Sequence, residues 1–204
     1  MKIKTLIASL GIVAFSSGVT IAAEEKDALE PGDAMPKTDV EMKNVDGDMV
    51  TLADVRGNKG TLVIFACNHC PFVKAWQDRI VKIGNTYSKK GVGVILINSN
   101  DPKKYKTDDF AHMKKRAKQQ GYKFPYVVDA TSDVARAFTA SRTPEVFLFN
   151  AEDELVYHGA IDDNPHHPDQ VEKRYLRNAL DALLAGEEIE NNETRSVGCS
   201  IKFR

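Results

Sequence analysis

The sequence has almost no net charge, few cysteines and no series of long apolar runs. Its 204 residues include 28 Lys and Arg against 29 Asp and Glu, and the net charge of −1 excludes the strongly basic surface of a nucleic-acid-binding protein. Three cysteines are too few for a small domain held together by disulfides. A hydrophobic fraction of 42% is too low for a multi-span membrane protein but sufficient for a core, which excludes a disordered chain. What remains is a soluble globular protein of about one domain.

Residues 1–23 have the pattern of a secretory signal peptide. Lys2 and Lys4 form a positive start, residues 5–22 carry no charge, and small residues end at Ala23 before an acidic stretch. The alternative is an uncleaved membrane anchor, because an uncharged stretch of about 18 residues is just long enough to span a bilayer. We expect cleavage and export, to a bacterial periplasm, where disulfides persist.

The rest of the chain divides into three parts. Residues 24–37 are polar and contain turn-forming residues, and we expect them to form an extended lead-in. Residues 38–186 form the predicted domain, and residues 187–204 form an irregular C-terminal tail without a clear period. At the start of the domain, the turn residues at 44–48 predict an N-terminal β-hairpin extension.

Strand-like and helix-like segments alternate along the domain. A stripe of apolar residues after Pro71, at spacings of 4, 4, 3 and 4, predicts an amphipathic helix that ends at Gly91. The alternation predicts an α/β fold with a mixed, mostly parallel central β-sheet that is flanked by helices and has an antiparallel edge. We expect strands at 61–66, 93–97, 124–128, 145–149 and 154–158, and helices at 71–90, 108–120, 132–139 and 169–185.

Cys67 and Cys70 are separated by two residues and fall where a buried strand ends and a helix begins. A helix N-terminus favours negative charge, so we expect it to stabilise a thiolate at Cys67, which is the reactive form of the side chain. Cys70 lies one turn further on, within reach of a mixed disulfide formed at Cys67, as thiol–disulfide exchange requires. His69, when protonated, adds a positive charge that stabilises the thiolate further.

Other interpretations of the cysteines are weaker. Cys67 and Cys70 could form half of a zinc site, but such a site needs a second pair of ligands and only one further cysteine, Cys199, remains. A passive disulfide between Cys67 and Cys70 would close too short a loop to stabilise the fold strongly. Cys199 itself can pair with a partner, act as an extra redox thiol or be inert. We predict a redox-active Cys67–Cys70 pair, with no cofactor and no bound metal.

The strand at 62–65 followed by Cys-Asn-His-Cys-Pro at 67–71 resembles the thioredoxin-like superfamily. Within it, the chain resembles the peroxiredoxin-like branch that is related to alkyl hydroperoxide reductases. The resemblance covers residues 31–204 and implies a thioredoxin-like fold. Four further stretches strengthen it, at 97–102, 124–126, 143–144 and 198–202.

The resemblance implies a role for each matching residue of the cysteine motif. Cys67 would be the attacking cysteine and Cys70 the resolving one of a redox-active disulfide. Asn68, His69 and Pro71 would tune the redox properties of this pair.

The resemblance also implies a substrate-binding position and partners. Pro144 would be a cis-proline that faces the two cysteines, and Thr143 would offer backbone hydrogen bonds to a substrate chain. The partners would be protein or small-molecule thiols and disulfides, with a membrane-bound electron donor or acceptor and no nucleic acid.

Two departures from the family pattern keep alternatives open. Ile64 occupies the place where peroxidatic sites carry Thr or Ser, and the Pro that begins that motif is missing. Residues 61–66 also lack the buried acid that many thioredoxins carry, so no proton acceptor for Cys70 can be named. We predict a thiol–disulfide oxidoreductase; the alternatives are a thiol-dependent peroxidase and a Cu(I) or Zn(II) metallochaperone that uses Cys67, Cys70 and a histidine.

Overall fold

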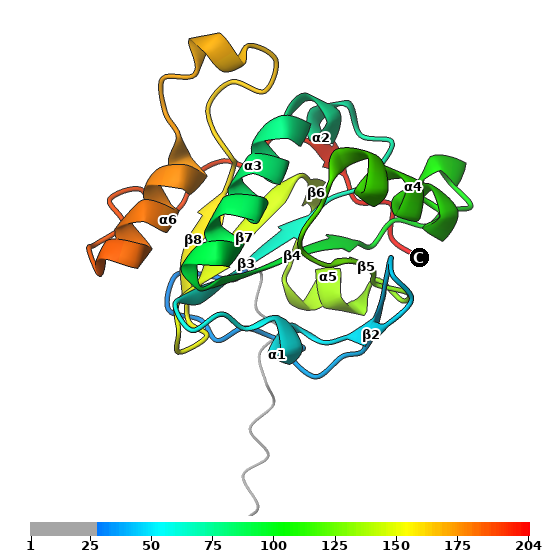
Figure 1. Ribbon diagram of the computed structural model, residues 1–204, viewed down its shortest axis with the longest axis horizontal. Coiled ribbons are helices and arrows are strands. Elements are labelled where there is room, and N and C mark those ends of the chain that lie inside the picture. The colour runs from blue at the N-terminus through cyan, green and yellow to red at the C-terminus, as the bar shows by residue number, and fades with distance from the viewer. Residues whose placement is uncertain (1–27) are drawn as a thin grey trace, which may run out of the picture.

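The computed structural model describes residues 28–204 of the chain (Figure 1). The predicted signal peptide, residues 1–23, and residues 24–27 of the predicted lead-in lie outside the described residues. Within the described part, no helix combines the length and the apolar character needed to cross a bilayer.

A seven-stranded mixed β-sheet forms the centre of the fold, with the strand order β2-β1-β5-β4-β3-β7-β8. The middle strands β5, β4 and β3 are parallel, and antiparallel pairs complete the sheet at both edges. The predicted fold class is therefore confirmed. The β1–β2 hairpin, predicted as an extension, is instead one edge of the central sheet, because β1 pairs with β5. The strands are β1 (Met42–Asn44), β2 (Met49–Val50), β3 (Gly60–Phe65), β4 (Val92–Asn98), β5 (Tyr126–Val128), β7 (Glu145–Phe149) and β8 (Leu155–Gly159).

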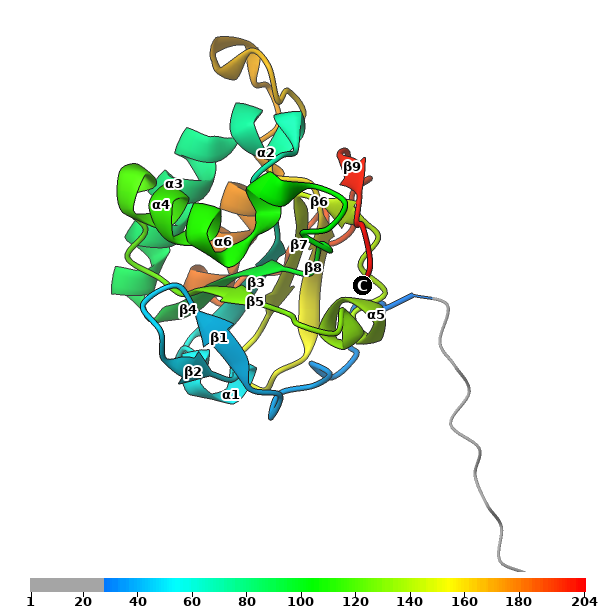
Figure 2. The same cartoon turned by 90° about the vertical axis from the view of Figure 1, so that its right-hand side faces the viewer.

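Helices cover both faces of the sheet (Figures 1 and 2). Along β3, Leu62 and Ile64 face α3, α4 and α6, whereas Val63 and Phe65 face α1 and α5. Because β3 is buried on both faces, its sequence is apolar at almost every position rather than at alternate ones. The helices are α1 (Leu52–Val55), α2 (Pro71–Ala75), α3 (Gln77–Tyr87), α4 (Phe110–Gln120), α5 (Asp133–Ala137) and α6 (Tyr175–Ala185).

The amphipathic helix predicted after Pro71 is divided into α2 and α3 at Trp76. The backbone of Trp76 has φ −90° and ψ 0°, outside the helical range. Its ring is buried, and its Nε1 donates a hydrogen bond to Asp162 Oδ1 at 2.7 Å. A short 3-10 turn, Ser88–Lys90, follows α3 and ends at Gly91, which has a positive φ of 91° that suits glycine.

The closing helix is also shorter than predicted. Residues Pro168–Gln170 form a single 3-10 turn, and α6 begins only at Tyr175. The N–H of Leu176 donates to the carbonyl of Ile161 rather than to a residue of its own helix. This hydrogen bond fixes the start of α6 against the segment that follows β8.

The C-terminal tail is more regular than predicted. Within it, β9 (Cys199–Ser200) pairs antiparallel with β6 (Arg142–Thr143), and Ile201 is buried. Figure 2 shows β9 beside β6, at the same end of the sheet as α2. The irregular tail expected from the lack of a period is therefore wrong at these residues, because two residues of strand are too short to produce a pattern.

Candidate active site

The two cysteines of the predicted redox pair lie in the cysteine loop, residues 67–70, which joins β3 to α2. Cys70 is the N-cap of α2, and Pro71 occupies the first turn, where a missing N–H leaves no hydrogen bond unmade. Both cysteines are thiols, and only 1% of Cys67 and 0% of Cys70 is exposed. The sulfurs therefore lie at the margin of the core rather than on the surface.

Thr143 contacts both sulfurs. Its hydroxyl oxygen lies 3.3 Å from Cys67 Sγ, and its carbonyl oxygen accepts a hydrogen bond from Cys70 Sγ at 3.0 Å. The peptide bond between Thr143 and Pro144 is cis, which confirms that prediction. The structure thus brings the two predicted cysteines and Thr143 into direct contact.

The titrations of the two thiols are coupled. The hydrogen bond with Cys67 lowers the pKa of Cys70 to about 4. The same hydrogen bond, together with burial and the negative charge of Asp108, raises the pKa of Cys67. Because the two titrations are coupled, the pair loses its first proton easily and holds its second one tightly.

The place of the thiolate within the reduced pair stays a prediction. We predicted that the helix N-terminus would stabilise a thiolate at Cys67; the N-cap of α2 is Cys70, and its side chain makes no capping hydrogen bond with the first turn. The Cys70 thiol donates to the carbonyl of Thr143, so this contact places a proton on Cys70.

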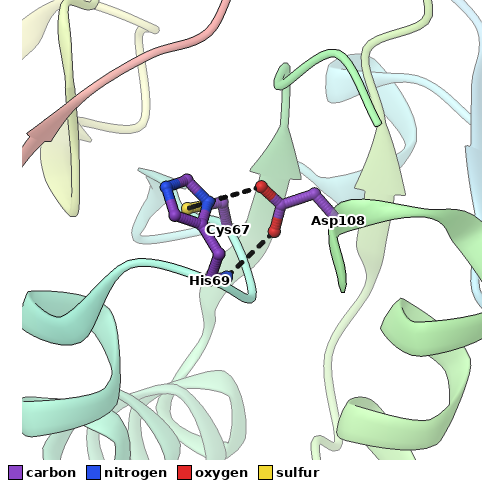
Figure 3. Close-up of side chains that lie close together, drawn as sticks. All are labelled: Cys67, His69 and Asp108. Atoms are coloured by element: carbon purple, nitrogen blue, oxygen red, sulfur yellow. Dashed lines mark hydrogen bonds and ion pairs between the residues drawn. The ribbon is translucent and has the colours of Figure 1, made fainter. Parts of the chain in front are cut away.

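Asp108 organises the cysteine loop from a distant segment (Figure 3). Its Oδ1 accepts the backbone N–H groups of Asn68 at 2.6 Å and His69 at 3.0 Å. Its Oδ2 lies 2.6 Å from His69 Nδ1 and accepts the side-chain amide of Asn100 at 2.9 Å. The Asp108 side chain is 0% exposed, so these four donors replace water around the carboxylate.

Asp108 could not be predicted as a site residue, because it lies 40 residues from Asn68 along the chain. It ends a 3-10 turn, Lys106–Asp108, between β4 and α4. The only signal was a pair of acids at the start of the helix predicted at 108–120, which begins at Phe110 in the structure and needs one cap. Asp109 is that cap, since its side chain accepts the N–H of His112, and this leaves Asp108 for another role.

The two residues between the cysteines face different surroundings. His69 Nδ1 lies 3.4 Å from Cys67 Sγ, and its ring stacks on Tyr105 with the centroids 3.8 Å apart. The side chain of Asn68 points away from the sulfurs, toward two other segments of the protein. Its amide donates to the carbonyl of Thr107 at 2.8 Å and accepts from the hydroxyl of Tyr126 at 3.1 Å. Of the residues predicted to tune the pair, His69 touches a sulfur, whereas Asn68 anchors the loop.

A second His–carboxylate pair holds the segment that precedes Thr143. Glu145 Oε2 accepts the backbone N–H groups of Ser141 and Arg142, each at 2.8 Å. Its Oε1 lies 2.9 Å from His158 Nε2. Sequence analysis missed this pair as well, because the register of β7 and β8 brings the two residues together.

Cys199 lies against the pair from the C-terminal tail. It is the antiparallel partner of Thr143, and it packs against the core cluster that contains Cys67 and Cys70. The backbone of Thr143, predicted to receive a substrate chain, is therefore paired with β9 in the structure.

The site also brings together three groups of the kind that bind metals. Cys67, His69 and Asp108 each offer one ligand atom, and these atoms lie within 4.8 Å of one another. Within residues 28–204, this is the one cluster of such groups with that spacing.

The fold and the buried dithiol place the chain among thioredoxin-like proteins that are related to peroxiredoxins. More specifically, the model of the Redoxin family matches residues 30–175, and the chain belongs to that family.

Several characterised proteins and solved structures are similar to this chain. The thiol-disulfide oxidoreductase ResA of Geobacillus thermodenitrificans is 28% identical over 148 residues, which cover 71% of this chain and 75% of that protein. ResA of Halalkalibacterium halodurans is 24% identical over 115 residues, or 56% of this chain, and the match spans only 61% of that protein. A crystal structure of a conserved protein from Geobacillus kaustophilus is 41% identical, with a TM-score of 0.81 over 86% of this chain and 93% of that one. A peroxidoxin from Mycobacterium tuberculosis shares the fold at 14% identity over 77% of this chain and 97% of that one, with a TM-score of 0.59.

Proposed function

We propose that the protein is a thiol–disulfide oxidoreductase whose Cys67 and Cys70 alternate between dithiol and disulfide. The observation that carries the proposal is the meeting of two buried thiols at Thr143: Cys67 Sγ lies 3.3 Å from its hydroxyl oxygen, and Cys70 Sγ donates to its carbonyl oxygen at 3.0 Å. The titrations of the two thiols are coupled, and this coupling lowers the pKa of one of them. A thiolate is the reacting form in thiol–disulfide exchange, so such a pair is active at neutral pH. The similarity to proteins named thiol-disulfide oxidoreductase ResA supports the same activity.

The first step is attack by Cys67 on one sulfur of a substrate disulfide. The proton of Cys67 passes to Cys70, the thiol of Cys70 donates to the Thr143 carbonyl, and the Thr143 hydroxyl lies close enough to donate to the Cys67 thiolate. The substrate S–S bond breaks, a Cys67–substrate disulfide forms, and the other substrate sulfur leaves as a thiolate that takes up a proton.

The second step is attack by Cys70 on Cys67. Ionised Cys70 displaces the second substrate sulfur, and the Cys67–Cys70 bond forms, so two electrons have passed from the pair to the substrate. The same steps in reverse oxidise a substrate dithiol. Before this attack the Cys70 thiol gives up the proton it received from Cys67, and the first substrate thiolate can accept that proton.

Reduction of insulin disulfides by the mature protein tests this function. We expect Cys67→Ser to abolish the reduction and Cys70→Ser to accumulate a mixed disulfide with the substrate at Cys67. Serine keeps the size of the side chain, so a fold control by circular dichroism accompanies both variants. Equal rates for the wild type and Cys67→Ser would overturn the proposal.

The direction of electron flow follows from the reduction potential of the pair. Equilibration with glutathione mixtures gives this potential, and a value near about −270 mV indicates a thioredoxin-like reductant, whereas a value near about −120 mV indicates an oxidant. We propose protein or small-molecule disulfides and thiols as substrates, and a membrane-bound protein as the electron donor or acceptor.

We also propose that the protein works in an exported compartment, on the basis of the signal-peptide pattern at residues 1–23. Cell fractionation followed by N-terminal sequencing tests this. A mature chain in the periplasm that begins at Glu24 supports the proposal, and an unprocessed chain in the cytoplasm contradicts it.

Thiol-dependent peroxide reduction is a second candidate that one contact favours. The hydroxyl of Thr143 lies 3.3 Å from Cys67 Sγ and so offers the hydroxyl that the sequence lacks at Ile64. The measurement is consumption of hydrogen peroxide with a thiol donor. Turnover that disappears in Cys67→Ser supports this activity, and no turnover in the wild type rejects it.

Metal delivery is a third candidate, favoured by the clustering of Cys67, His69 and Asp108. Thiolate and imidazole are suitable ligands for Cu(I) and Zn(II). Reduced protein dialysed against buffer after loading with zinc retains one equivalent if the site binds, and His69→Ala then releases it. A wild-type protein that retains no metal excludes this candidate.

A further inference from the structure

Cys199 lies where it can react with the Cys67–Cys70 pair. In the β6–β9 ladder its Cα partner is Thr143, the residue whose carbonyl oxygen and hydroxyl lie 3.0 and 3.3 Å from the two other sulfurs. Cys199 also packs against the core cluster that contains Cys67 and Cys70. All three cysteines of the chain are thus gathered around one residue.

The tail that carries Cys199 is held in place on both sides. A Cβ atom at Gly198 would lie 2.1 Å from the carbonyl oxygen of Thr143, so only glycine allows the tail to approach this closely. Arg142 Nη1 donates to the carbonyl of Gly198 at 3.2 Å. Beyond β9, the N–H of Lys202 donates to Asn100 Oδ1 at 2.8 Å. The position of Cys199 is therefore set by the fold.

Asn100 links this anchor to the centre of the site. The side chain that accepts the N–H of Lys202 also donates to Asp108, which holds the cysteine loop. Asn100 therefore holds the tail, Asp108 holds the cysteine loop, and the hydrogen bond between these two side chains maintains the spacing between the sulfurs of the two segments.

The three thiols differ in their access to solvent. Cys67 and Cys70 are buried, whereas Cys199 is partly exposed, and the side chains of Val197 and Ser200 beside it are exposed. A folded protein partner at this surface therefore meets Cys199 before the buried pair.

The charge state of Cys199 depends on the redox state of the pair. Burial, the hydrogen bond with Cys70 and the charge of Cys70 raise the pKa of Cys199 to about 11, which keeps it protonated while the pair is reduced. The last two contributions disappear when Cys70 enters a disulfide, and the nearby Lys202 then favours the thiolate. Cys199 is thus inactive toward a reduced pair and becomes a better nucleophile once the pair is oxidised.

We propose that Cys199 is a third redox-active cysteine, which takes over the disulfide from the buried pair and presents it to a dithiol protein at the surface. The Cys199 thiolate attacks Cys70 Sγ, the Cys70–Cys199 bond forms, the Cys67–Cys70 bond breaks, and Cys67 leaves as a thiolate that can accept the proton lost by Cys199. The exchange conserves electrons within the three cysteines and needs no other oxidant. The protein dithiol then reduces the Cys70–Cys199 bond and is itself oxidised to a disulfide. This proposal rests on the oxidoreductase function proposed above.

The first test asks whether the second disulfide forms. Cys67→Ser leaves two cysteines, so after oxidation with glutathione disulfide any intramolecular bond joins Cys70 to Cys199. Peptide mapping under non-reducing conditions should find this bond in most molecules. The matched control is Cys67→Ser with Cys199→Ser and Ser200→Cys, which moves the thiol to the opposite side of β9 and should leave both thiols free. Two free thiols in Cys67→Ser itself would overturn the proposal.

The second test asks whether the relay is used. We expect Cys199→Ser to form the Cys67–Cys70 disulfide and to be reduced by dithiothreitol at the wild-type rate, but to be reduced at least tenfold more slowly by thioredoxin as the protein dithiol probe. Equal rates for both reductants in the variant and the wild type contradict the relay while leaving the oxidoreductase function intact. Absence of a Cys67–Cys70 disulfide in the oxidised wild type would instead reject the proposed function itself.

Discussion

Two His–carboxylate pairs in this molecule are built alike and lie in different surroundings. In one, His69 Nδ1 lies 2.6 Å from Asp108, and in the other, His158 Nε2 lies 2.9 Å from Glu145. In each pair the carboxylate also accepts two consecutive backbone N–H groups, from the cysteine loop for Asp108 and from the chain before Thr143 for Glu145. The same device thus fixes the two segments that meet at the sulfurs.

The pairs differ in what the histidine ring touches. His69 lies beside Cys67 Sγ, whereas His158 stacks on the ring of Phe147 with the centroids 4.4 Å apart. A buried His–carboxylate pair is therefore a way to hold a loop, and it acts on reactivity only where the pair also reaches a reacting atom. Variants of the two pairs separate these two contributions.

The largest expected effect is the loss of a carboxylate. Asp108→Ala leaves two backbone N–H groups and the amide of Asn100 unpaired in the interior, and we expect it to lower the free energy of unfolding by about 3 kcal/mol. Glu145→Ala leaves two partly buried N–H groups unpaired and should cost about 2 kcal/mol. Urea denaturation of both variants measures the difference. An unchanged unfolding midpoint for Asp108→Ala would show that the carboxylate does not hold the loop.

The next largest effect should be the pH dependence of the free energy of unfolding of the reduced protein. Its pair binds one proton in the folded state, since the pKa of Cys70 is about 4 and that of Cys67 is raised, but two protons in the unfolded chain below about pH 8. The unfolded state binds more protons, so the free energy of unfolding should rise with pH up to about pH 8, and this stabilisation should be lost as the pH falls toward 4. Denaturation of the reduced and oxidised proteins across this range tests it, because the oxidised protein lacks the effect.

The same proton count fixes the slope of the reduction potential. Reduction takes up one proton for two electrons, so the potential should fall by about 30 mV per pH unit, against about 59 mV for the uptake of two protons. His158→Phe should leave this slope unchanged. A slope near about 59 mV per pH unit in the wild type would show that reduction takes up two protons, and would contradict this proton count.

Removal of one charge should have a smaller effect. Asp108→Asn removes a negative charge that raises the pKa of Cys67, and it keeps an oxygen for the loop N–H groups. The reduced pair becomes more stable relative to the disulfide, and we expect the potential to rise by about 30 mV. Glu145→Gln is the matched control, for which equilibration with glutathione should give the wild-type potential. A rise in both variants would mean that the two carboxylates act alike.

The smallest expected effect concerns the histidines. His69→Phe keeps a ring to stack on Tyr105 and removes the imidazole nitrogen that lies 3.4 Å from Cys67 Sγ, so the Cys67 thiolate loses a polar neighbour. Alkylation of Cys67 by iodoacetamide at pH 7, resolved by mass spectrometry, should slow about fivefold, the effect of about 1 kcal/mol. His158→Phe should react at the wild-type rate, and slowing of similar size there would remove the distinction between the pairs.

The sequence was sufficient to predict the local parts of this site. The run before Cys67, the start of α2 at Pro71 and the cis bond at Pro144 follow from neighbouring residues and from the family resemblance. Asp108 and the placement of Cys199 could not be predicted, because they depend on pairing between segments that are far apart in the chain. The order in which Cys67 and Cys70 ionise could not be predicted either, because it depends on the contacts of both sulfurs with Thr143, which lies far away in the chain.

The break between α2 and α3 gives the protein a built-in optical reporter. Trp76 is the only tryptophan of the chain, it is buried, and it follows directly on the short helix that Cys70 begins. Its indole is fixed by the hydrogen bond to Asp162, so a small displacement of α2 changes the packing around the ring and hence its fluorescence. Reduction and oxidation of the cysteines can therefore be followed in the unlabelled protein, in real time and without a coupled enzyme.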